Sequence, residues 1–198
     1  MSVPAILAIA LLTLAGCSGE QPEAAAANEQ SNEAAIDEAG TNALANEVAV
    51  PAGLGAAAPF AILGPSGEAR GFASFTSDGQ RTTIKVNAEG LPAGVHGIHL
   101  HAVGRCDGPK FESAGAHWNP AGKQHGKDNP QGAHVGDLPN LTAGADGKAS
   151  ASFAIDGDMA DADGTALVIH AKADDYKTDP SGNSGDRIAC AVLTTAGR

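Results

Sequence analysis

The histidines of this chain are spaced in a way that suits metal binding. There are seven in 198 residues, and three of them fall in His96-Gly-Ile-His-Leu-His101. Residues two apart in a β-strand point to the same face, so His99 and His101 can both reach one metal ion. The same spacing would also fit a polar stripe facing solvent. His96 lies at odd spacing from both, and we expect it to be a buried hydrogen-bonding residue near the site.

A second group of ligand-type side chains follows within residues 117–137, namely His117, His125, His134 and Asp137. Three imidazoles and a carboxylate in a loop rich in Gly and Pro suit a closed tetrahedral zinc site. The alternative is a polar surface loop with scattered histidines. Four ligand-type residues so close together, in a chain with few histidines, favour the zinc site.

The last histidine, His170, ends the apolar run Leu167-Val-Ile-His170. A buried imidazole costs free energy unless it is satisfied, and a metal would satisfy it. Asp174 and Asp175 follow closely and could hold ligand imidazoles through their second ring nitrogen. Arg187 is either a surface cation or a residue held in place by a link from its neighbour Cys190 to the Cys106 loop.

The elements that must position these residues are β-strands. Strand patterns cover residues 71–76, 82–87, 95–102, 149–155, 165–171 and 187–194, with an Asp-Gly turn between the first two. No sustained helical periodicity is present in the domain, so we predict an all-β sandwich or barrel. The segment 103–140 has few β-formers, and so long a loop needs something to order it, which a metal would do.

The N-terminal 58 residues differ from the rest. Residues 1–17 contain an apolar run from Ala5 to Ala15 and end in Leu-Ala-Gly-Cys17, which resembles the lipobox of bacterial lipoproteins. An ordinary secretory signal is the alternative, and no Lys or Arg precedes the apolar run. Ser18 after the cysteine, rather than Asp, favours the outer membrane by the same resemblance. We therefore expect lipidation at Cys17 and a lipid anchor in the bacterial cell envelope, on the periplasmic side.

Residues 18–58 are rich in Ala and carry seven acids without a single Lys or Arg. Such a segment buries too little apolar surface to offset its ordering entropy, so we predict a disordered tether. It accounts for most of the net charge of −11 and leaves residues 59–198 only mildly acidic. In an exported domain, Cys106 and Cys190 are expected to form a disulfide, with two buried free thiols as the alternative.

Residues 60–196 resemble the copper–zinc superoxide dismutase family. The resemblance rests on Gly94-Val-His-Gly-Ile-His-Leu-His101, Gly115-Ala-His-Trp-Asn-Pro120, His125-Gly126, His134-Val-Gly-Asp137, Leu167-Val-Ile-His170 and Gly182-Asn-Ser-Gly-Asp-Arg-Ile-Ala-Cys190. It implies an eight-stranded Greek-key β-barrel or sandwich with long metal-binding loops over residues 59–198.

The resemblance also implies roles for individual residues. Copper would be ligated by His99, His101, His117 and His170, and zinc by His117, His125, His134 and Asp137. His117 would then bridge the two metals as an imidazolate. Asp174 would join a copper ligand to a zinc ligand, Arg187 would bind the anion, and Cys106–Cys190 would pin the loop to the barrel.

The implied activity is dismutation of superoxide to dioxygen and hydrogen peroxide by alternate reduction and reoxidation of copper, as antioxidant defence of the envelope. The implied partners are superoxide and a membrane, with no nucleic acid; a monomer and a homodimer both remain open. Lys177 is the leading candidate for steering the anion, opposed by Asp179 and Asp186. A copper-binding module without catalysis and a structural domain that uses only zinc are the competing hypotheses.

Overall fold

The computed structural model describes residues 59–159 and 163–195. The predicted signal peptide (1–17), its lipidated Cys17 and the tether (18–58) lie outside the described residues. The described chain is all-β apart from one short 3-10 helix, η1 (Glu112–Ala114). Its strands are β1 (Phe60–Leu63), β2 (Ala69–Ser77), β3 (Arg81–Ala88), β4 (Gly94–His96), β5 (Ile98–His101), β6 (Leu141–Ala143), β7 (Ala149–Asp156), β8 (Gly164–His170) and β9 (Arg187–Thr195).

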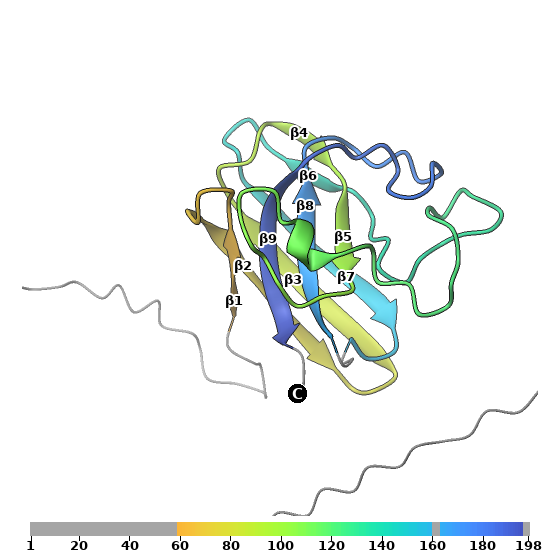
Figure 1. Cartoon of the computed structure of the whole chain (residues 1–198). Helices are drawn as coiled ribbons and strands as arrows, with labels where there is room; N and C mark the ends of the chain where they lie inside the picture. The colour runs from red at the N-terminus through yellow and green to blue at the C-terminus, as the bar shows by residue number, and fades with distance from the viewer. Residues whose placement is uncertain (1–58, 160–162, 196–198) are drawn as a thin grey trace, which may run out of the picture. The chain divides into compact units, whose positions relative to one another are not determined.

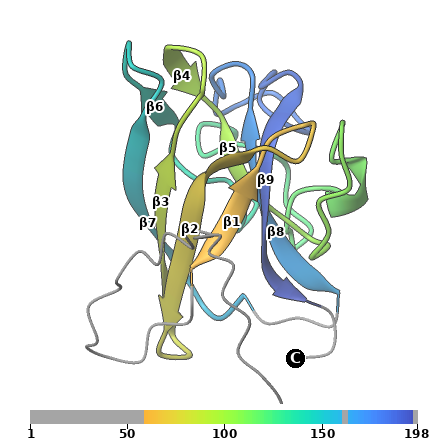
Figure 2. The ribbon, with the colours of Figure 1, turned by 90° about the vertical axis from the view of Figure 1, so that its left-hand side faces the viewer.

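The strands form a curled antiparallel sheet in the order β5-β8-β9-β1-β2-β3-β7, together with a short β4–β6 pair (Figures 1 and 2). The neighbours β5–β8, β9–β1 and β3–β7 are not consecutive in sequence, as a Greek-key arrangement requires. β4 and β5 are one strand interrupted at Gly97, so the expected eight strands are present. β6 pairs with β4 and packs against β7, which links the two edges of the curled sheet.

The β2–β3 hairpin forms for local reasons that the sequence shows. Asp78 Oδ1 accepts hydrogen bonds from the backbone N–H groups of Gln80 and Arg81, at 2.9 and 2.7 Å. Gly79 has a φ of +84°, which a residue with a side chain rarely adopts. β3 alternates exposed or half-buried with buried residues, so one face packs on the core. The predicted hairpin is confirmed.

β5 and β8 lie side by side, and their two faces pack against different residues. One face carries Ile98 and Leu100 of β5 with Leu167 and Ile169 of β8, all within the main hydrophobic core. The other face of β8 carries Ala166 and Val168, which pack in a second apolar cluster together with Phe111, Ala114 and Cys190. β8 is therefore buried on both sides, which explains why its sequence reads as a continuous apolar run.

Two short strands, β1 and β6, and the interruption at Gly97 were not expected from the sequence. A Cβ at Gly97 would lie 2.6 Å from Ser184 Oγ, so this position needs glycine for close approach of the 171–186 loop. The long connection at residues 102–140 has the predicted loop character, with η1 and one-residue bridges as its regular structure. Within the described chain, no helix is long and apolar enough to cross a membrane.

Candidate metal centre

Three histidines reach the centre from strands. His99 and His101 of β5 are opposite Val168 and Ala166 of β8, so they lie on the face that points away from the main core. His170 ends β8 on that same face. All three are buried, because the loops at residues 102–140 and 171–186 cover them. The alternation of β5 thus places leucine and isoleucine in the core and both histidines under the loops.

The long loop is fastened along the free edge of β5. Leu100 N donates to Gly136 O at 2.9 Å, and Leu100 O accepts from Trp118 N at 2.8 Å. Gly136 N in turn donates to Trp118 O at 2.9 Å. One-residue bridges pair His99 with Asp137 and His101 with His117. Backbone pairing alone therefore brings two residues of the second predicted group against the strand that carries the first.

The first group has the geometry of a metal site. His99, His101, His117 and His170 each offer one nitrogen, and these nitrogens all lie within 4.8 Å of one another. Four buried nitrogens of this group have no hydrogen-bond partner, namely His99 Nδ1, His101 Nε2, His117 Nε2 and His170 Nε2. Buried imidazole nitrogens without partners are costly unless a cation binds them. These residues fit a copper ion with four imidazole ligands.

The second nitrogen of each strand histidine is already engaged. His99 Nε2 lies 2.8 Å from Asp174 Oδ2, His101 Nδ1 lies 2.9 Å from Gly115 O, and His170 Nδ1 lies 3.1 Å from Gly185 O. Each of these oxygens accepts a hydrogen bond from the ring N–H. The proton is therefore held on that nitrogen, and the lone pair of the other ring nitrogen stays free. The free nitrogens are the four that converge.

The second group converges on one carboxylate oxygen. Asp137 Oδ1 lies 2.9 Å from His117 Nδ1, 2.9 Å from His125 Nδ1 and 3.1 Å from His134 Nδ1. Asp137 Oδ2 accepts the backbone N–H groups of Gly126 and His134, which fixes the carboxylate. One oxygen and three imidazole nitrogens fit a tetrahedral zinc ion. His117 belongs to both groups, through Nε2 in the first and Nδ1 in the second.

His99 also falls within 4.8 Å of His117, His125 and Asp137, so proximity alone does not separate the two groups. Its Nε2 is bonded to Asp174, and the only nitrogen left is Nδ1, which faces the first group. His134, by contrast, directs Nδ1 to the Asp137 oxygen. We therefore place His134, and not His99, in the second group.

Asp174 connects the two groups. Its Oδ2 lies 2.8 Å from His99 Nε2 and its Oδ1 lies 3.0 Å from His125 Nε2. Sequence reasoning missed two residues that hold it. Asn140 Nδ2 donates to Asp174 O and Asn140 Oδ1 accepts from Asp174 N, both at 2.9 Å, while Tyr176 N donates to Asp174 Oδ1 at 2.7 Å.

Asp175, which could also have anchored an imidazole, is exposed and bonds only within its own loop. Its carboxylate accepts hydrogen bonds from Lys177, Thr178 and Asn183. His96 lies beside the first group, with Nδ1 2.8 Å from His170 O and Nε2 2.8 Å from Pro92 O. Both ring nitrogens are thus occupied by backbone, and His96 has none to offer a metal.

Burial sets the protonation of the first group. It lowers the pKa of His101 to about 2, that of His170 to about 3 and that of His117 to about 4. Burial also lowers the pKa of His99, although Asp174 opposes it. These rings are therefore neutral near pH 7, which is the form that binds metals.

The second group is more polar. Burial lowers the pKa of His125, but the carboxylates of Asp137 and Asp174 outweigh it and raise that pKa to about 9. Burial raises the pKa of both aspartates, but hydrogen bonds with histidines outweigh it and hold each pKa well below its usual range. The aspartates are thus ionised, and a zinc ion would replace the proton on His125.

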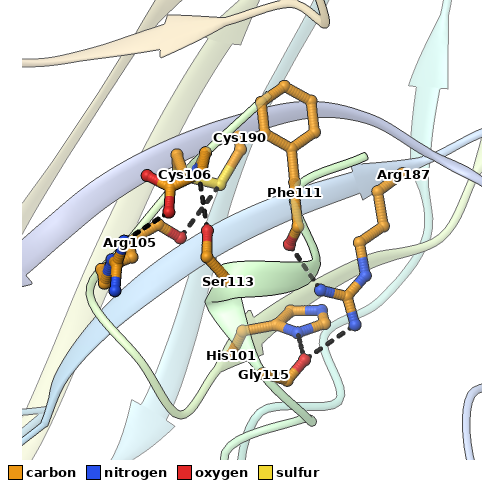
Figure 3. Close-up of a disulfide and its surroundings, with 9 residues drawn as sticks. His101, Arg105, Cys106, Phe111, Ser113, Gly115, Arg187 and Cys190 are labelled. Carbon is orange, nitrogen blue, oxygen red and sulfur yellow. Dashed lines mark hydrogen bonds and ion pairs between the residues drawn. A yellow bond between two sulfur atoms is a disulfide. The ribbon is translucent and has the colours of Figure 1, made fainter. Parts of the chain in front are cut away.

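Arg187 lies beside His101 and Gly115 (Figure 3) and lines the cavity over the histidines. Its Nη1 donates to Phe111 O at 2.6 Å and its Nη2 donates to Gly115 O at 2.7 Å, the same oxygen that His101 Nδ1 approaches. Burial lowers the pKa of Arg187, and the charge of Glu112 opposes that effect. The guanidinium keeps further N–H donors free for an anion.

The predicted disulfide is confirmed: Cys106 and Cys190 are bonded, with Cα atoms 5.7 Å apart. It ties the loop before η1 to β9, which also carries Arg187. A cavity of about 540 Å³ opens over the histidines and is lined by His101, Glu112, Gly115, Ala116, His117, His170, Pro180, Ser181, Gly185 and Arg187. Lys177, the expected steering cation, does not line it.

Comparison with known proteins gives a consistent result. The sequence model of the family "Copper/zinc superoxide dismutase (SODC)" matches residues 69–193. Superoxide dismutase-like protein YojM of Bacillus subtilis is 43% identical over 143 residues, which cover 67% of this chain and 73% of that protein. Superoxide dismutase [Cu-Zn] 2 of Aquifex aeolicus is 40% identical over 144 residues, covering 67% of this chain and 83% of the relative.

Solved structures share the fold. A variant of the Bacillus subtilis SOD-like protein superposes with a TM-score of 0.67 at 41% identity and covers 70% of this chain and 99% of its own. Cu/Zn superoxide dismutase from Brucella abortus has a TM-score of 0.55 at 31% identity and covers 69% of this chain and 98% of its own. Together with the two histidine groups, these matches show that the chain belongs to the copper/zinc superoxide dismutase family.

Proposed function

We propose that this protein is a lipid-anchored superoxide dismutase of the bacterial cell envelope, using copper and zinc. The observation that carries the enzymatic part is the convergence of four unpartnered imidazole nitrogens beside a second ligand group that shares His117. Overall, two superoxide anions and two protons become one dioxygen and one hydrogen peroxide, so one anion loses the electron that the other gains.

When bound, copper supplies the one-electron redox couple for this exchange, and zinc supplies charge and loop order without redox change. His99, His101, His117 and His170 would hold copper through the nitrogens that lack other partners. His117, His125, His134 and Asp137 would hold zinc. Asp174 keeps His99 and His125 oriented through their opposite nitrogens.

Arg187 binds and orients the anion. Two of its N–H groups are fixed by Phe111 O and Gly115 O, so the guanidinium is held in one orientation at the cavity wall. A fixed cation beside the histidines attracts superoxide even though the domain carries a net negative charge.

His117 supplies the place where a proton can be held between the two halves of the reaction. Its Nε2 faces the first group and is free of other partners, whereas Nδ1 faces Asp137. A proton held at Nε2 while that atom is not bound to copper could be passed to the peroxide formed in the second half of the reaction. The ring stays in place during this transfer because Asp137 and the one-residue bridge to His101 hold it.

The first experiment is dismutation by the full chain loaded with copper and zinc, beside the His117→Ala variant and the zinc-only form. We expect rapid dismutation by the wild type loaded with both metals, and none by the His117→Ala variant or by the zinc-only form. His117→Ala should also fail to bind one copper and one zinc per chain. Stoichiometric copper and zinc without dismutation would instead establish a copper-binding module.

The envelope location is supported by the lipobox-like Leu-Ala-Gly-Cys17 and by the disulfide, which forms in oxidising compartments. Metabolic labelling with an alkyne fatty acid tests it. We expect label on the wild type and none on Cys17→Ala. Ser18→Asp should keep the label but move the protein from the outer to the inner membrane fraction. A soluble, unlabelled wild type would refute the anchor.

A further inference from the structure

Glu112 is an acidic residue that neither the metal ligation nor the anion binding explains. It is the first residue of η1 and is exposed. It lines the cavity over the histidines and also a neighbouring outer cavity of about 610 Å³, whose walls include Lys110, Asp186 and Arg187. Glu112 and Arg187 line both cavities, so a carboxylate shares the cavity walls with the guanidinium that would bind the anion.

The backbone position of Glu112 is fixed by Arg187. Arg187 holds the residue before η1 through Phe111 O and the residue after it through Gly115 O, as Figure 3 shows. The same loop is fastened by the Cys106–Cys190 disulfide and by a hydrogen bond from Asp107 N to Ser113 Oγ at 2.8 Å. The carboxylate is therefore attached to a rigid segment.

Glu112 acts on Arg187 through charge and not through a contact. Within the described residues the two form no ion pair, yet both line the same two cavities, so the negative charge of Glu112 acts on the guanidinium across the cavity wall. The carboxylate therefore lowers the positive potential at the guanidinium without occupying its N–H donors. An arriving anion finds those donors free but the attraction reduced.

We propose that Glu112 is a charge filter at the mouth of the metal cavity, which limits how strongly anions are drawn to Arg187. This inference rests on the proposed function, because superoxide is the anion that it would limit. Other acids are placed differently: Asp186 lines only the outer cavity, and Asp179 Oδ1 accepts the backbone N–H of His125. Glu112 is the acid that shares the inner cavity with the histidines.

The test compares Glu112→Gln with Glu89→Gln in the full chain loaded with copper and zinc. Glu89 is also exposed and loses the same charge, but it lines a separate surface hollow on the sheet with Phe72 and Lys148. Two quantities are measured per bound copper across a range of ionic strength. They are the rate constant for superoxide and the affinity for azide, a small anion followed by the absorption of copper.

We expect Glu112→Gln to raise both quantities about two- to fivefold at low ionic strength, with the gain vanishing near 1 M salt. Glu89→Gln should match the wild type. Equal behaviour of the two variants in azide affinity would overturn the filter, even if the wild type dismutates superoxide. Tighter azide binding by Glu112→Gln alone, in a protein that does not dismutate, would support the filter and refute the proposed activity.

Discussion

At the scale of single residues, Asp174 has the most specific task outside the ligand groups. An amide at this position has one oxygen and one donating nitrogen, so it cannot accept from both His99 and His125. We expect Asp174→Asn to weaken zinc affinity about 10- to 100-fold, measured by competition with a chelator. Asp175→Asn, a change of the same kind in the same loop, should keep the affinity of the wild type. An equal loss in both variants would mean that loop order matters, and not the link between histidines.

Gly182 shows how closely the loop is packed on Asp174. Its φ is +63°, and a Cβ would overlap the Asp174 carboxylate. Gly79 also has a positive φ, of +84°, but a Cβ added there would lie in open space. We expect Gly79→Ala to lower the free energy of unfolding by about 1–2 kcal/mol through φ alone. Gly182→Ala should cost about 1–3 kcal/mol more through overlap. Urea unfolding of the metal-loaded chain measures both, and equal losses would argue against the overlap.

Residue types and spacing predicted that His99 and His101 share a metal and that His117, His125, His134 and Asp137 form a zinc site. The place of His117 in both groups followed from the family resemblance and not from the spacing. The sequence could not predict Asn140 or Tyr176 as partners of Asp174, since polar loop residues carry no sign of what they will contact. Nor could it identify Glu112. Its place in the cavity depends on Arg187, distant in sequence, holding both ends of η1.

At the scale of elements, the strands with local signals were predictable and those defined by tertiary pairing were not. β3 and β7 alternate buried with more exposed residues, and the Asp78-Gly79 turn defines the β2–β3 hairpin. β1 has four residues without alternation and forms because β2 and β9 flank it. The face on which β5 presents its histidines also depends on its pairing with β8. The spacing shows that His99 and His101 share a face, but not which face is covered by loops.

The disulfide is the strongest link between a loop and the sheet. It closes a separation of 84 residues, for which chain entropy gives roughly 4 kcal/mol. We expect the double variant Cys106→Ala/Cys190→Ala to lower the free energy of unfolding by about 2–4 kcal/mol in denaturant titration. Cys17→Ala removes the remaining cysteine and should leave that free energy unchanged. Identical unfolding of the double variant and the wild type would show that hydrogen bonds alone fasten the loop.

At the scale of the whole domain, the sheet and the site depend on different forces. The barrel strands bury a continuous apolar core, which includes Ile62, Ile84, Leu100, Leu167 and Leu193. The loops at residues 102–140 and 171–186 contribute little to that core, and η1 is the helix that the described chain has within them. Their ligand residues lie around ionised carboxylates and unpartnered imidazoles. Metal binding must therefore stabilise the loops far more than the sheet.

Hydrogen exchange of the metal-free chain, with and without zinc, tests this division. Zinc that binds only the folded domain adds about 2.7 kcal/mol of stability at 100 times its dissociation constant. We expect the added amide protection to appear in residues 117–140 and 171–186, because Asp137 holds the first segment together and Asp174 joins it to the second. The amides of the β2–β3 hairpin should exchange at the same rate with and without zinc, apart from those that exchange only when the whole domain unfolds. Magnesium is the control, since a site of three imidazoles and one carboxylate does not suit its preference for oxygen ligands. Protection that rises equally in the hairpin and the loops would mean that the loops are already as firmly held as the sheet. Protection that also rises with magnesium would mean that the effect does not depend on a zinc site of imidazole ligands.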